Sequence, residues 1–253
     1  MPLSGRVVMR VDLYLVHHGL IETRAKAQEA IAAGMVSVGG QVVTKASQKI
    51  AEGAIVQARP AHPYVSRAAL KLVAGLDRFA IDPAGRICLD VGSSTGGFTE
   101  VLLEGGAARV HAVDVGHGQL HPSLRCDPRV VSMEGVDARR LTAAAFAEPP
   151  SLIVCDASFI SLLKVIPRPM SLAANQADLI ALVKPQFEVG RAAIGRGGLV
   201  KSAKERARAV AEVRAALDGL EGFRVRDVIE SPVKGGDGNQ EYLIAARRNV
   251  DSR

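Results

Sequence analysis

The chain has 253 residues, of which 48% are hydrophobic and 23% charged, a composition that supports one large domain or a medium and a small one. Its net charge of +6 is weak evidence for a polyanionic partner, while an aromatic content of 4% argues against base stacking as the main binding mode. No apolar run approaches the roughly 20 residues that cross a bilayer, and Asp12 with two histidines interrupts the N-terminal segment, so we expect neither a membrane span nor a signal peptide.

The three cysteines, Cys88, Cys126 and Cys155, have no Cys-x-x-Cys spacing and cannot all pair within one chain. Cys88 and Cys155 lie inside apolar runs, which is typical of reduced thiols in a protein core. We therefore expect a cytoplasmic protein without a metal centre.

The first 59 residues have the pattern of a small α+β domain, which we place at 1–59. The expected elements are two helices, a hairpin and a further strand, over 10–19, 23–34, 36–43 and 55–58. The hairpin is indicated by two short β-prone runs around Gly39-Gly40. Basic residues recur through this segment and together suggest a surface that faces phosphates, although each one alone is as well explained by solvation.

A resemblance to the S4 RNA-binding module is carried by RVDLYLVHHGLIETRAKAQEAIAAGMVSVGGQVVTKASQKI. The departures are small: Val11 stands for Leu, Thr23 for Ser, and Gly39 where Asn is usual. The resemblance implies that this domain docks on structured RNA. The basic residues that we expect to contact RNA, here and in the remainder of the chain, are Arg10, Arg24, Lys26, Lys45, Lys49, Arg67, Arg191 and Arg196.

Two prolines, Pro60 and Pro63, indicate a short, semi-rigid linker over 60–66. A helix is predicted to follow over 67–79, capped by Ser66. We expect its apolar face to consist of Ala69, Leu70, Val73 and Leu76.

From residue 86 apolar strands alternate with helical stretches, which predicts an α/β sheet within a second domain at 67–253. The predicted strands are 86–92, 109–116, 129–135, 151–157, 178–184, 223–230 and 241–248. The last two are joined by SPVKGGDGNQ, which is too short for a helical crossover, so we expect them to be antiparallel. Six strands in alternation with helices and one reversed strand resemble the layout of a class I methyltransferase.

The first strand of this sheet ends in LDVGSSTGGFT, a glycine-rich turn that lets the backbone approach a ligand at a helix N-terminus. Asp114 ends the next strand, where a carboxylate can accept from two ribose hydroxyls, as it also does in NAD enzymes. Asp90 favours S-adenosylmethionine, whose amino group needs a counter-charge. Asp137 either accepts from the adenine amino group or caps a helix. The expected cofactor contacts are Asp90, Gly92, Ser93, Ser94, Gly96, Gly97, Phe98, Asp114, Asp137 and Asp156.

Four groups with reactive side chains converge in this topology: Lys71, Asp156, Lys184 and Glu241. Asp156 and Lys184 end neighbouring strands, and Glu241 opens the antiparallel strand, so all three are expected at one edge of the sheet. Methylation of a hydroxyl requires loss of a proton, which a lysine amine can accept or direct. Pro185 biases Lys184 towards an extended backbone.

These four residues match the Lys-Asp-Lys-Glu tetrad of the FtsJ-like RNA 2′-O-methyltransferases. With the S4 module and the motifs LDVGSSTGGFT, CDASFISL, LVKPQFEVGR and SPVKGGDGNQEYL, nearly the whole chain resembles the TlyA family, historically called hemolysins. The resemblance implies S-adenosylmethionine-dependent 2′-O-methylation of cytidine in 16S or 23S ribosomal RNA, or both. Ala68-Ala69 replaces a common Gly-Gly, and Asp137 replaces a frequent Asn.

The segment QFEVGRAAIGRGGLVKSAKER combines glycines with Arg191, Arg196 and Lys201 and is interpreted as a lid or a grip on the RNA backbone. Three other functions stay open. The chain could be a membrane-active hemolysin, a non-catalytic rRNA-binding or ribosome-assembly factor, or a small-molecule methyltransferase. The sequence is silent on oligomeric state.

Overall fold

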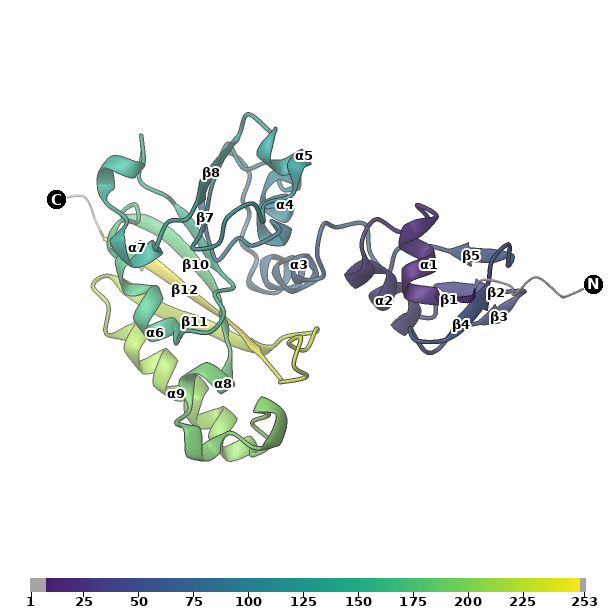
Figure 1. Cartoon of the computed structure of the whole chain (residues 1–253). Helices are drawn as coiled ribbons and strands as arrows, with labels where there is room; N and C mark the ends of the chain where they lie inside the picture. Colours follow the sequence, from purple (N-terminus) through teal and green to yellow (C-terminus); the bar gives the residue numbers. More distant parts are fainter. Residues whose placement is uncertain (1–7, 251–253) are drawn as a thin grey trace, which may run out of the picture. The chain divides into compact units, whose positions relative to one another are not determined.

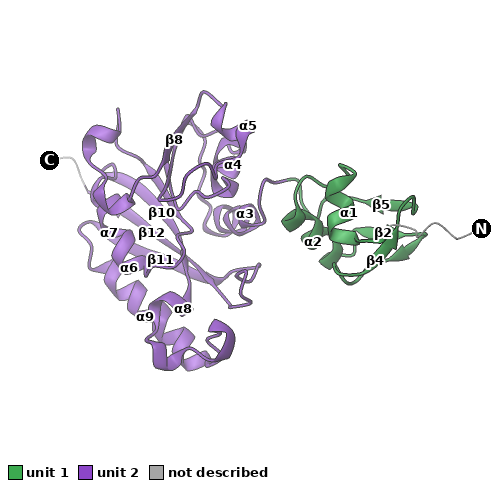
Figure 2. Cartoon of the chain, in the orientation of Figure 1, with its two compact units in different colours: residues 1–63 green, residues 64–253 purple. Residues whose placement is uncertain are grey.

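The computed structural model describes residues 8–250 and divides into two compact units, residues 1–63 and 64–253 (Figure 2). Each unit has its own hydrophobic core.

The smaller unit contains the two predicted helices and the predicted hairpin. Its elements are β1 Val8–Arg10, α1 Val11–His17, α2 Arg24–Ala32, β2 Val36–Val38, β3 Gln41–Val42, β4 Lys49–Ala51 and β5 Val56–Ala58. Strand β2 pairs antiparallel with both β3 and β5, and β1 pairs antiparallel with β4, a ladder that the sequence did not predict. Thr23 caps α2 by accepting a hydrogen bond from the backbone N–H of Lys26.

The larger unit is built on one seven-stranded sheet in which all seven predicted strands are confirmed (Figure 1). Across the sheet the strands are β11 Phe223–Glu230, β12 Tyr242–Asn249, β10 Gln176–Val183, β9 Leu152–Cys155, β6 Ile87–Val91, β7 Arg109–Asp114 and β8 Val130–Glu134. As predicted, β12 runs antiparallel to both of its neighbours, and the pairs from β10 to β8 are parallel. The chain order reverses between β6 and β9, which is the point of such sheets where ligands bind beyond the carboxyl ends of the strands.

Helices cover both faces of this sheet. They are α3 Ala68–Phe79, α4 Gly97–Glu104, α5 Pro122–Arg125, α6 Leu162–Val165, α7 Pro167–Ser171, α8 Pro185–Glu188 and α9 Ala203–Asp218, with single 3₁₀ turns at Ala138–Arg140, Ala143–Ala145, Arg191–Ala193 and Arg196–Gly198.

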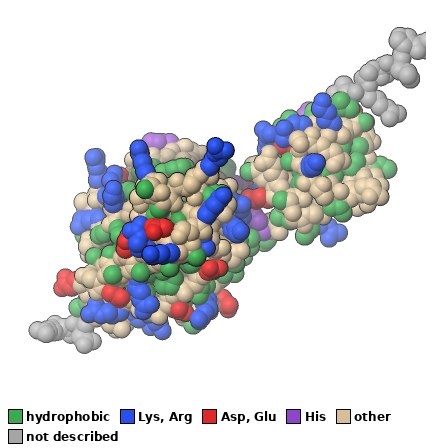
Figure 3. Space-filling view, turned by 90° about the horizontal axis from the view of Figure 1, so that it is seen from below, with side chains coloured by type: hydrophobic (Ala, Val, Ile, Leu, Met, Phe, Trp, Pro, Cys, Tyr) green, Lys and Arg blue, Asp and Glu red, His purple; other side chains and the backbone are tan. Residues whose placement is uncertain are grey.

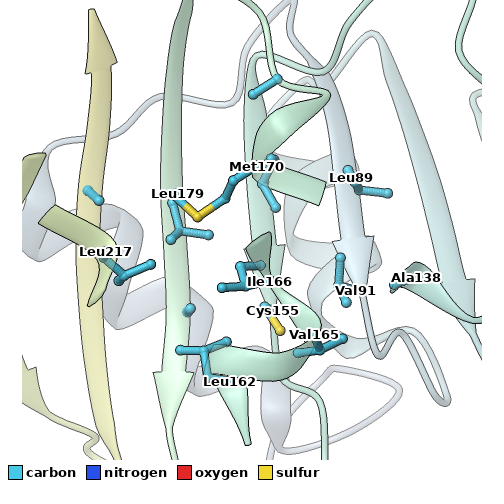
Figure 4. Packing of buried hydrophobic residues seen from close by; sticks show 14 of the residues in the cluster. Leu89, Val91, Ala138, Cys155, Leu162, Val165, Ile166, Met170, Leu179 and Leu217 are labelled. Carbon is cyan, nitrogen blue, oxygen red and sulfur yellow. The ribbon is translucent and has the colours of Figure 1, made fainter. Parts of the chain in front are cut away.

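Consecutive residues of β10 belong to different cores, because a strand alternates its side chains between the two faces of the sheet. Leu179 joins the cluster that Met170 and Ile166 build with α6, α7 and α9 (Figure 4), whereas Ile180 joins Leu72 in the cluster under α3 and α4. Burial on both faces explains why β10 is a continuous apolar run in the sequence.

The buried face of α3 differs from the predicted one. The helix buries Ala69, Leu72 and Phe79, while Val73 is 39% exposed, and Lys71 and Gly75 share the buried face. Gly75 lets the helix lie close to the sheet, since a Cβ there would come within 3.2 Å of a side-chain atom of Ile180. The predicted cap is also wrong. Arg67 occupies the N-cap position, and no side chain, including that of Ser66, caps this helix.

Candidate active site

Lys71, Asp156, Lys184 and Glu241 form one continuous chain of ion pairs. The amine of Lys71 lies 2.6 Å from Glu241 Oε2 and 3.6 Å from Asp156 Oδ2, and the amine of Lys184 lies 2.6 Å from Asp156 Oδ1. The side chains are between 3% and 13% exposed, so water screens these pairs little. Two ammonium groups and two carboxylates leave the group neutral in total.

Different elements supply each member of this tetrad. Lys71 lies one helical turn before Gly75 on the buried face of α3, so its stem points towards the sheet. Glu241 lies just before β12, under a loop in which a Cβ at Gly235 would come within 2.6 Å of Glu241 Oε1. Only glycine fits at that position without displacing the carboxylate.

Lys184 follows β10, and its backbone is extended, with φ −108° and ψ 98°, as the following proline favours. Beside its ion pair with Asp156 Oδ1, the Lys184 amine donates hydrogen bonds to the backbone oxygen of Asp156 at 3.1 Å and to Ser158 Oγ at 2.7 Å. The sequence offered no reason to expect this role for Ser158.

A cavity of about 610 Å³ opens beside the tetrad at the carboxyl ends of β6, β7 and β9. It is lined by Val91, Gly92, Ser94, Val113, Asp114, Val115, Gly116, Gln119, Val136, Asp137, Ala138, Arg139, Asp156, Ala157, Ser158, Phe159, Ile160 and Val165. A second cavity of about 600 Å³ lies along residues 190–208. We take the first as the ligand site because it lies at the topological switch point and reaches Asp156.

The glycine-rich turn shapes one wall of this cavity. Gly92 has φ +81°, and a Cβ on it would lie 2.9 Å from backbone atoms of Ala157. Gly96 has φ +97° and packs against the side chains of Leu120 and Leu124. The turn therefore requires glycine at both positions, once for close approach to β9 and once for close packing.

Asp114 and Asp137 both line the cavity. Asp114 accepts hydrogen bonds from the backbone N–H groups of Ser94 and Gly116, at 2.8 Å each, one on either carboxylate oxygen. A carboxylate has about four lone-pair positions, so each oxygen can accept one more hydrogen. Asp137 caps the following 3₁₀ turn and pairs with Arg139, which lowers its pKa to about 2. Asp137 therefore caps the turn, which is one of the two roles predicted for it. It also lines the cavity, where a ligand can reach it.

Asp90 is completely buried behind the turn and accepts from Thr99 Oγ1 at 2.7 Å through one oxygen. Burial raises its pKa to about 7. Its other oxygen and the nearby Ser93 Oγ are buried without a hydrogen-bond partner in the described part of the chain. Buried polar atoms are rarely left unpaired, so both atoms fit a ligand that brings a donor to this turn.

Five residues of the predicted cofactor set do not line the cavity: Asp90, Ser93, Gly96, Gly97 and Phe98. Phe98 is 2% exposed and packs in the core under α4, and neither it nor Gly97 lines the cavity. Gly97 instead lies against Ser66 and the start of α3. In this structure the two residues contact the core and the start of α3.

Phe159 was not predicted and is the most exposed large apolar side chain in the described residues, at 92%. It lines the cavity three residues after Asp156 and has φ +64°, a left-handed conformation that is unfavourable for an aromatic residue. An exposed aromatic ring on a strained backbone beside reactive groups is a candidate contact for substrate.

The predicted RNA-binding residues fall into separate groups. In the smaller unit Arg10 and Arg24 both pair with the buried carboxylate of Asp12, each at 2.9 Å, which fixes the two guanidinium groups on one carboxylate. Lys26 pairs with Glu22 at 2.7 Å. The remaining lysines of this unit in the predicted set, Lys45 and Lys49, are exposed. Cationic side chains protrude from both units on the face drawn in Figure 3.

The larger unit holds the other three predicted residues. Arg191 and Arg196 are exposed on the two 3₁₀ turns between α8 and α9. Arg67 lies at the N-terminus of α3 and is only partly exposed.

Comparison with known proteins defines the class to which the site belongs. The profile of FtsJ-like methyltransferases matches residues 64–248, and that of the S4 domain matches residues 9–56. The chain is thus an FtsJ-like methyltransferase domain preceded by an S4 domain.

Relatives that match nearly the whole chain identify the family within this class. A 16S/23S rRNA (cytidine-2′-O)-methyltransferase, TlyA of Mycobacterium tuberculosis, is 46% identical over 96% of this chain and 91% of its own. Hemolysin A of Brachyspira hyodysenteriae is 41% identical over 93% of this chain and 98% of its own. A structure named as a hemolysin of Streptococcus thermophilus superposes with a TM-score of 0.76 at 38% identity, covering 96% of this chain and 90% of that one. The chain belongs to the TlyA family.

Two negative findings concern a membrane-spanning helix and a metal site. Within residues 8–250 no helix is long and apolar enough to cross a membrane. Over the same range no three side chains of His, Cys, Asp or Glu are grouped so that they could hold a metal ion.

Proposed function

We propose that this protein transfers the methyl group of S-adenosylmethionine to the ribose 2′-oxygen of cytidine in 16S or 23S ribosomal RNA, or both. The observation that carries the proposal is the buried chain Lys71–Glu241–Asp156–Lys184 beside a cavity at the carboxyl edge of the sheet. The name of the M. tuberculosis relative supports the same reaction and substrate. A protein that modifies ribosomal RNA works where ribosomes are assembled, so we place it in the cytoplasm.

The residues around the cavity fit the proposed cofactor, which supplies a methyl group already activated on a sulfonium. Asp114 has a free position on each oxygen for the two ribose hydroxyls. The unpaired oxygen of Asp90 and the unpaired Ser93 Oγ match the cofactor's ammonium group. Val115, which is 69% exposed, and Val136 offer apolar surface to the adenine, with Asp137 beside them.

Within the tetrad we assign the contact with substrate to Lys184, because its partner Asp156 lines the cavity. Its amine donates to Ser158 Oγ, a neutral acceptor that a ribose hydroxyl can replace. Held by this amine, the 2′-oxygen directs a lone pair at the methyl carbon. The O–CH₃ bond would form as the S–CH₃ bond of the sulfonium and the O–H bond break, so that the cofactor leaves as a neutral thioether and the proton passes to a carboxylate of the tetrad and then to water.

Lys71 and Glu241 hold the charge balance of the site. The Lys71 amine lies between the two carboxylates, so Asp156 keeps one cationic neighbour whenever Lys184 turns to the substrate. These two residues are assigned a positioning role in the reaction.

Recognition of the RNA is assigned to the S4 domain and to Phe159. The S4 domain offers Arg10 and Arg24 to phosphates of folded rRNA. A cytidine inside a helix cannot reach the cavity, so the target must leave its stack, and the exposed ring of Phe159 offers it a new stacking partner.

The test is transfer of tritiated methyl groups to purified small and large ribosomal subunits, followed by mapping of the ribose methylation. Incorporation at a cytidine 2′-oxygen supports the proposal and identifies the subunit. Binding of rRNA without any transfer would instead support an assembly factor. Release of liposome contents without transfer would favour the hemolysin.

A further inference from the structure

A third cavity, of about 310 Å³, lies between the segment that follows α8 and the loop that precedes β12. It is lined by Leu199, Val200, Lys201, Arg206, Glu230, Lys234, Gly238, Asn239 and Gln240. None of these residues belongs to the tetrad or to the cofactor cavity. The lining contains no aromatic ring, which disfavours a nucleobase as its occupant.

The charge of this cavity is positive. Lys201, Arg206 and Lys234 contribute three cations, against the single carboxylate of Glu230. Lys201 and Lys234 are both exposed, so their amines are available to a ligand from solvent. Such a mixture favours a compact anion over a cation or an apolar ligand.

One N–H group of Arg206 has no hydrogen-bond acceptor in the described residues. Its Nη1 donates to the backbone oxygens of Val200 at 3.0 Å and Lys201 at 2.8 Å, which fixes the guanidinium against this wall. Its Nε is buried and has no acceptor anywhere in residues 8–250. An arginine held in this way matches the fork by which guanidinium groups bind phosphate oxygens.

Buried polar contacts hold the two walls together. Asn239, which is 3% exposed, accepts from the backbone N–H of Val200 and donates to the backbone oxygen of Gly198, both at 2.9 Å. Gln186 donates to Asp237 at 3.1 Å across the same gap. The segment between α8 and α9, which the sequence predicts as a lid or a grip on the RNA backbone, is therefore fastened to the opposite loop.

The residues that make these contacts are close in sequence to two members of the tetrad. Gln186 comes two residues after Lys184, and Asn239 comes two residues before Glu241. A ligand held between these walls would bear on the two segments that present the catalytic groups.

We propose that this cavity binds a backbone phosphate of the RNA close to the target nucleotide, through Lys201, Lys234 and Arg206. The proposal rests on the proposed function, because it takes RNA as the ligand. A phosphate anchored here would fix the position of the neighbouring ribose relative to Lys184, in addition to the contacts of the S4 domain.

The test compares the double variant Lys201→Ala/Lys234→Ala with Lys204→Ala, an exposed lysine that does not line the cavity. Filter retention measures binding of the rRNA of purified subunits at several salt concentrations. We expect the double variant to bind at least tenfold more weakly and the slope of log K against log salt to fall by about one for each lysine that contacts a phosphate. The Lys204 variant should match the wild type.

Calorimetric titration with S-adenosylmethionine should give the same affinity for all three proteins, which shows that the fold is intact. In methyl transfer the double variant should have a lower kcat/KM for RNA than the wild type and the Lys204 variant. Equal RNA affinity and equal salt slopes for the double variant and the wild type would overturn the proposal. So would binding of inorganic phosphate that the double variant loses while its RNA affinity stays that of the wild type.

The binding measurement separates this proposal from the proposed function. Weaker RNA binding by the double variant, with no methyl transfer even by the wild type, would leave the phosphate site standing and remove the catalytic assignment. Methyl transfer by the wild type, with no effect of the double variant on RNA binding, would remove the phosphate site and leave the catalytic assignment standing.

Discussion

Replacement of Lys184 by glutamine tests the role of the tetrad most directly. A glutamine amide can still donate to Ser158 Oγ and to the backbone oxygen of Asp156, which accept from the lysine at 2.7 Å and 3.1 Å. It carries no charge. If the Lys184 ammonium holds the 2′-oxygen and directs its lone pair, methyl transfer should fall by about 10²–10⁴ while cofactor affinity stays within a factor of a few.

The same variant should cost stability by a predictable amount. Loss of one partner from a buried ion pair destabilises by about 3–5 kcal/mol, because the remaining charge is left uncompensated. Lys71, whose amine is 3.6 Å from the Asp156 carboxylate, retains part of the compensation, so we expect the lower end, about 3 kcal/mol. For a unit of this size that corresponds to a fall in Tm of roughly 6–12 °C.

The second variant Lys184→Gln/Asp156→Asn separates stability from chemistry. It removes both charges of the pair and leaves Lys71 with Glu241 at 2.6 Å, so most of the lost stability should return while activity should not. Thermal unfolding and single-turnover methyl transfer measure the two effects. A Lys184→Gln protein that transfers methyl groups within tenfold of the wild-type rate would refute the assignment of Lys184.

Three further predictions concern the cofactor cavity. Because burial raises the pKa of Asp90 to about 7, calorimetry should show S-adenosylmethionine affinity falling about tenfold per pH unit below 7 and levelling off above it, whereas unfolding of the free protein should become easier as the pH rises from about 4 to 7. A pH-independent affinity would contradict the pairing of Asp90 with the ammonium group. Gly92→Ala should lose about 1–3 kcal/mol of stability in denaturant titration and most cofactor binding, since its φ is +81° and its Cβ would lie 2.9 Å from the Ala157 backbone. Phe159→Ala should unfold within about 0.5 kcal/mol of the wild type, because the ring is 92% exposed, yet lose roughly 5- to 150-fold in kcat/KM for rRNA if the ring stacks on a base; unchanged kinetics would exclude stacking.

The sequence predicts the sheet well because its central strands, β6, β9 and β10, are buried on both faces. Such strands are continuous apolar runs, and the short connection before β12 leaves only an antiparallel arrangement. It does not predict the ladder of β1 with β4. Those strands have three residues each and lie about forty residues apart in the sequence, so neither carries a pattern of its own.

The buried face of α3 is hard to predict, whereas that of α4 follows from its spacing. Lys71 and Gly75 lie on the buried face of α3, so the apolar stripe is interrupted where the helix approaches the tetrad, and the pattern predicts Val73 in place of Leu72. Phe98, Val101 and Leu102 follow the spacing of one helix face, which directs Phe98 into the core and away from the glycine turn.

Phe159 could not have been found from the sequence, because its exposure and its positive φ are consequences of the loop that folds over β9. The tetrad is a different case. Lys71 and Glu241 are 170 positions apart, and no local pattern joins them, yet their charged atoms lie 2.6 Å apart. The strand order brings them together, because β12 lies beside β10 and α3 packs against both strands. A prediction of sheet topology was therefore enough to expect three of the four groups at one edge, while the helix that brings the fourth could be placed only from its packing.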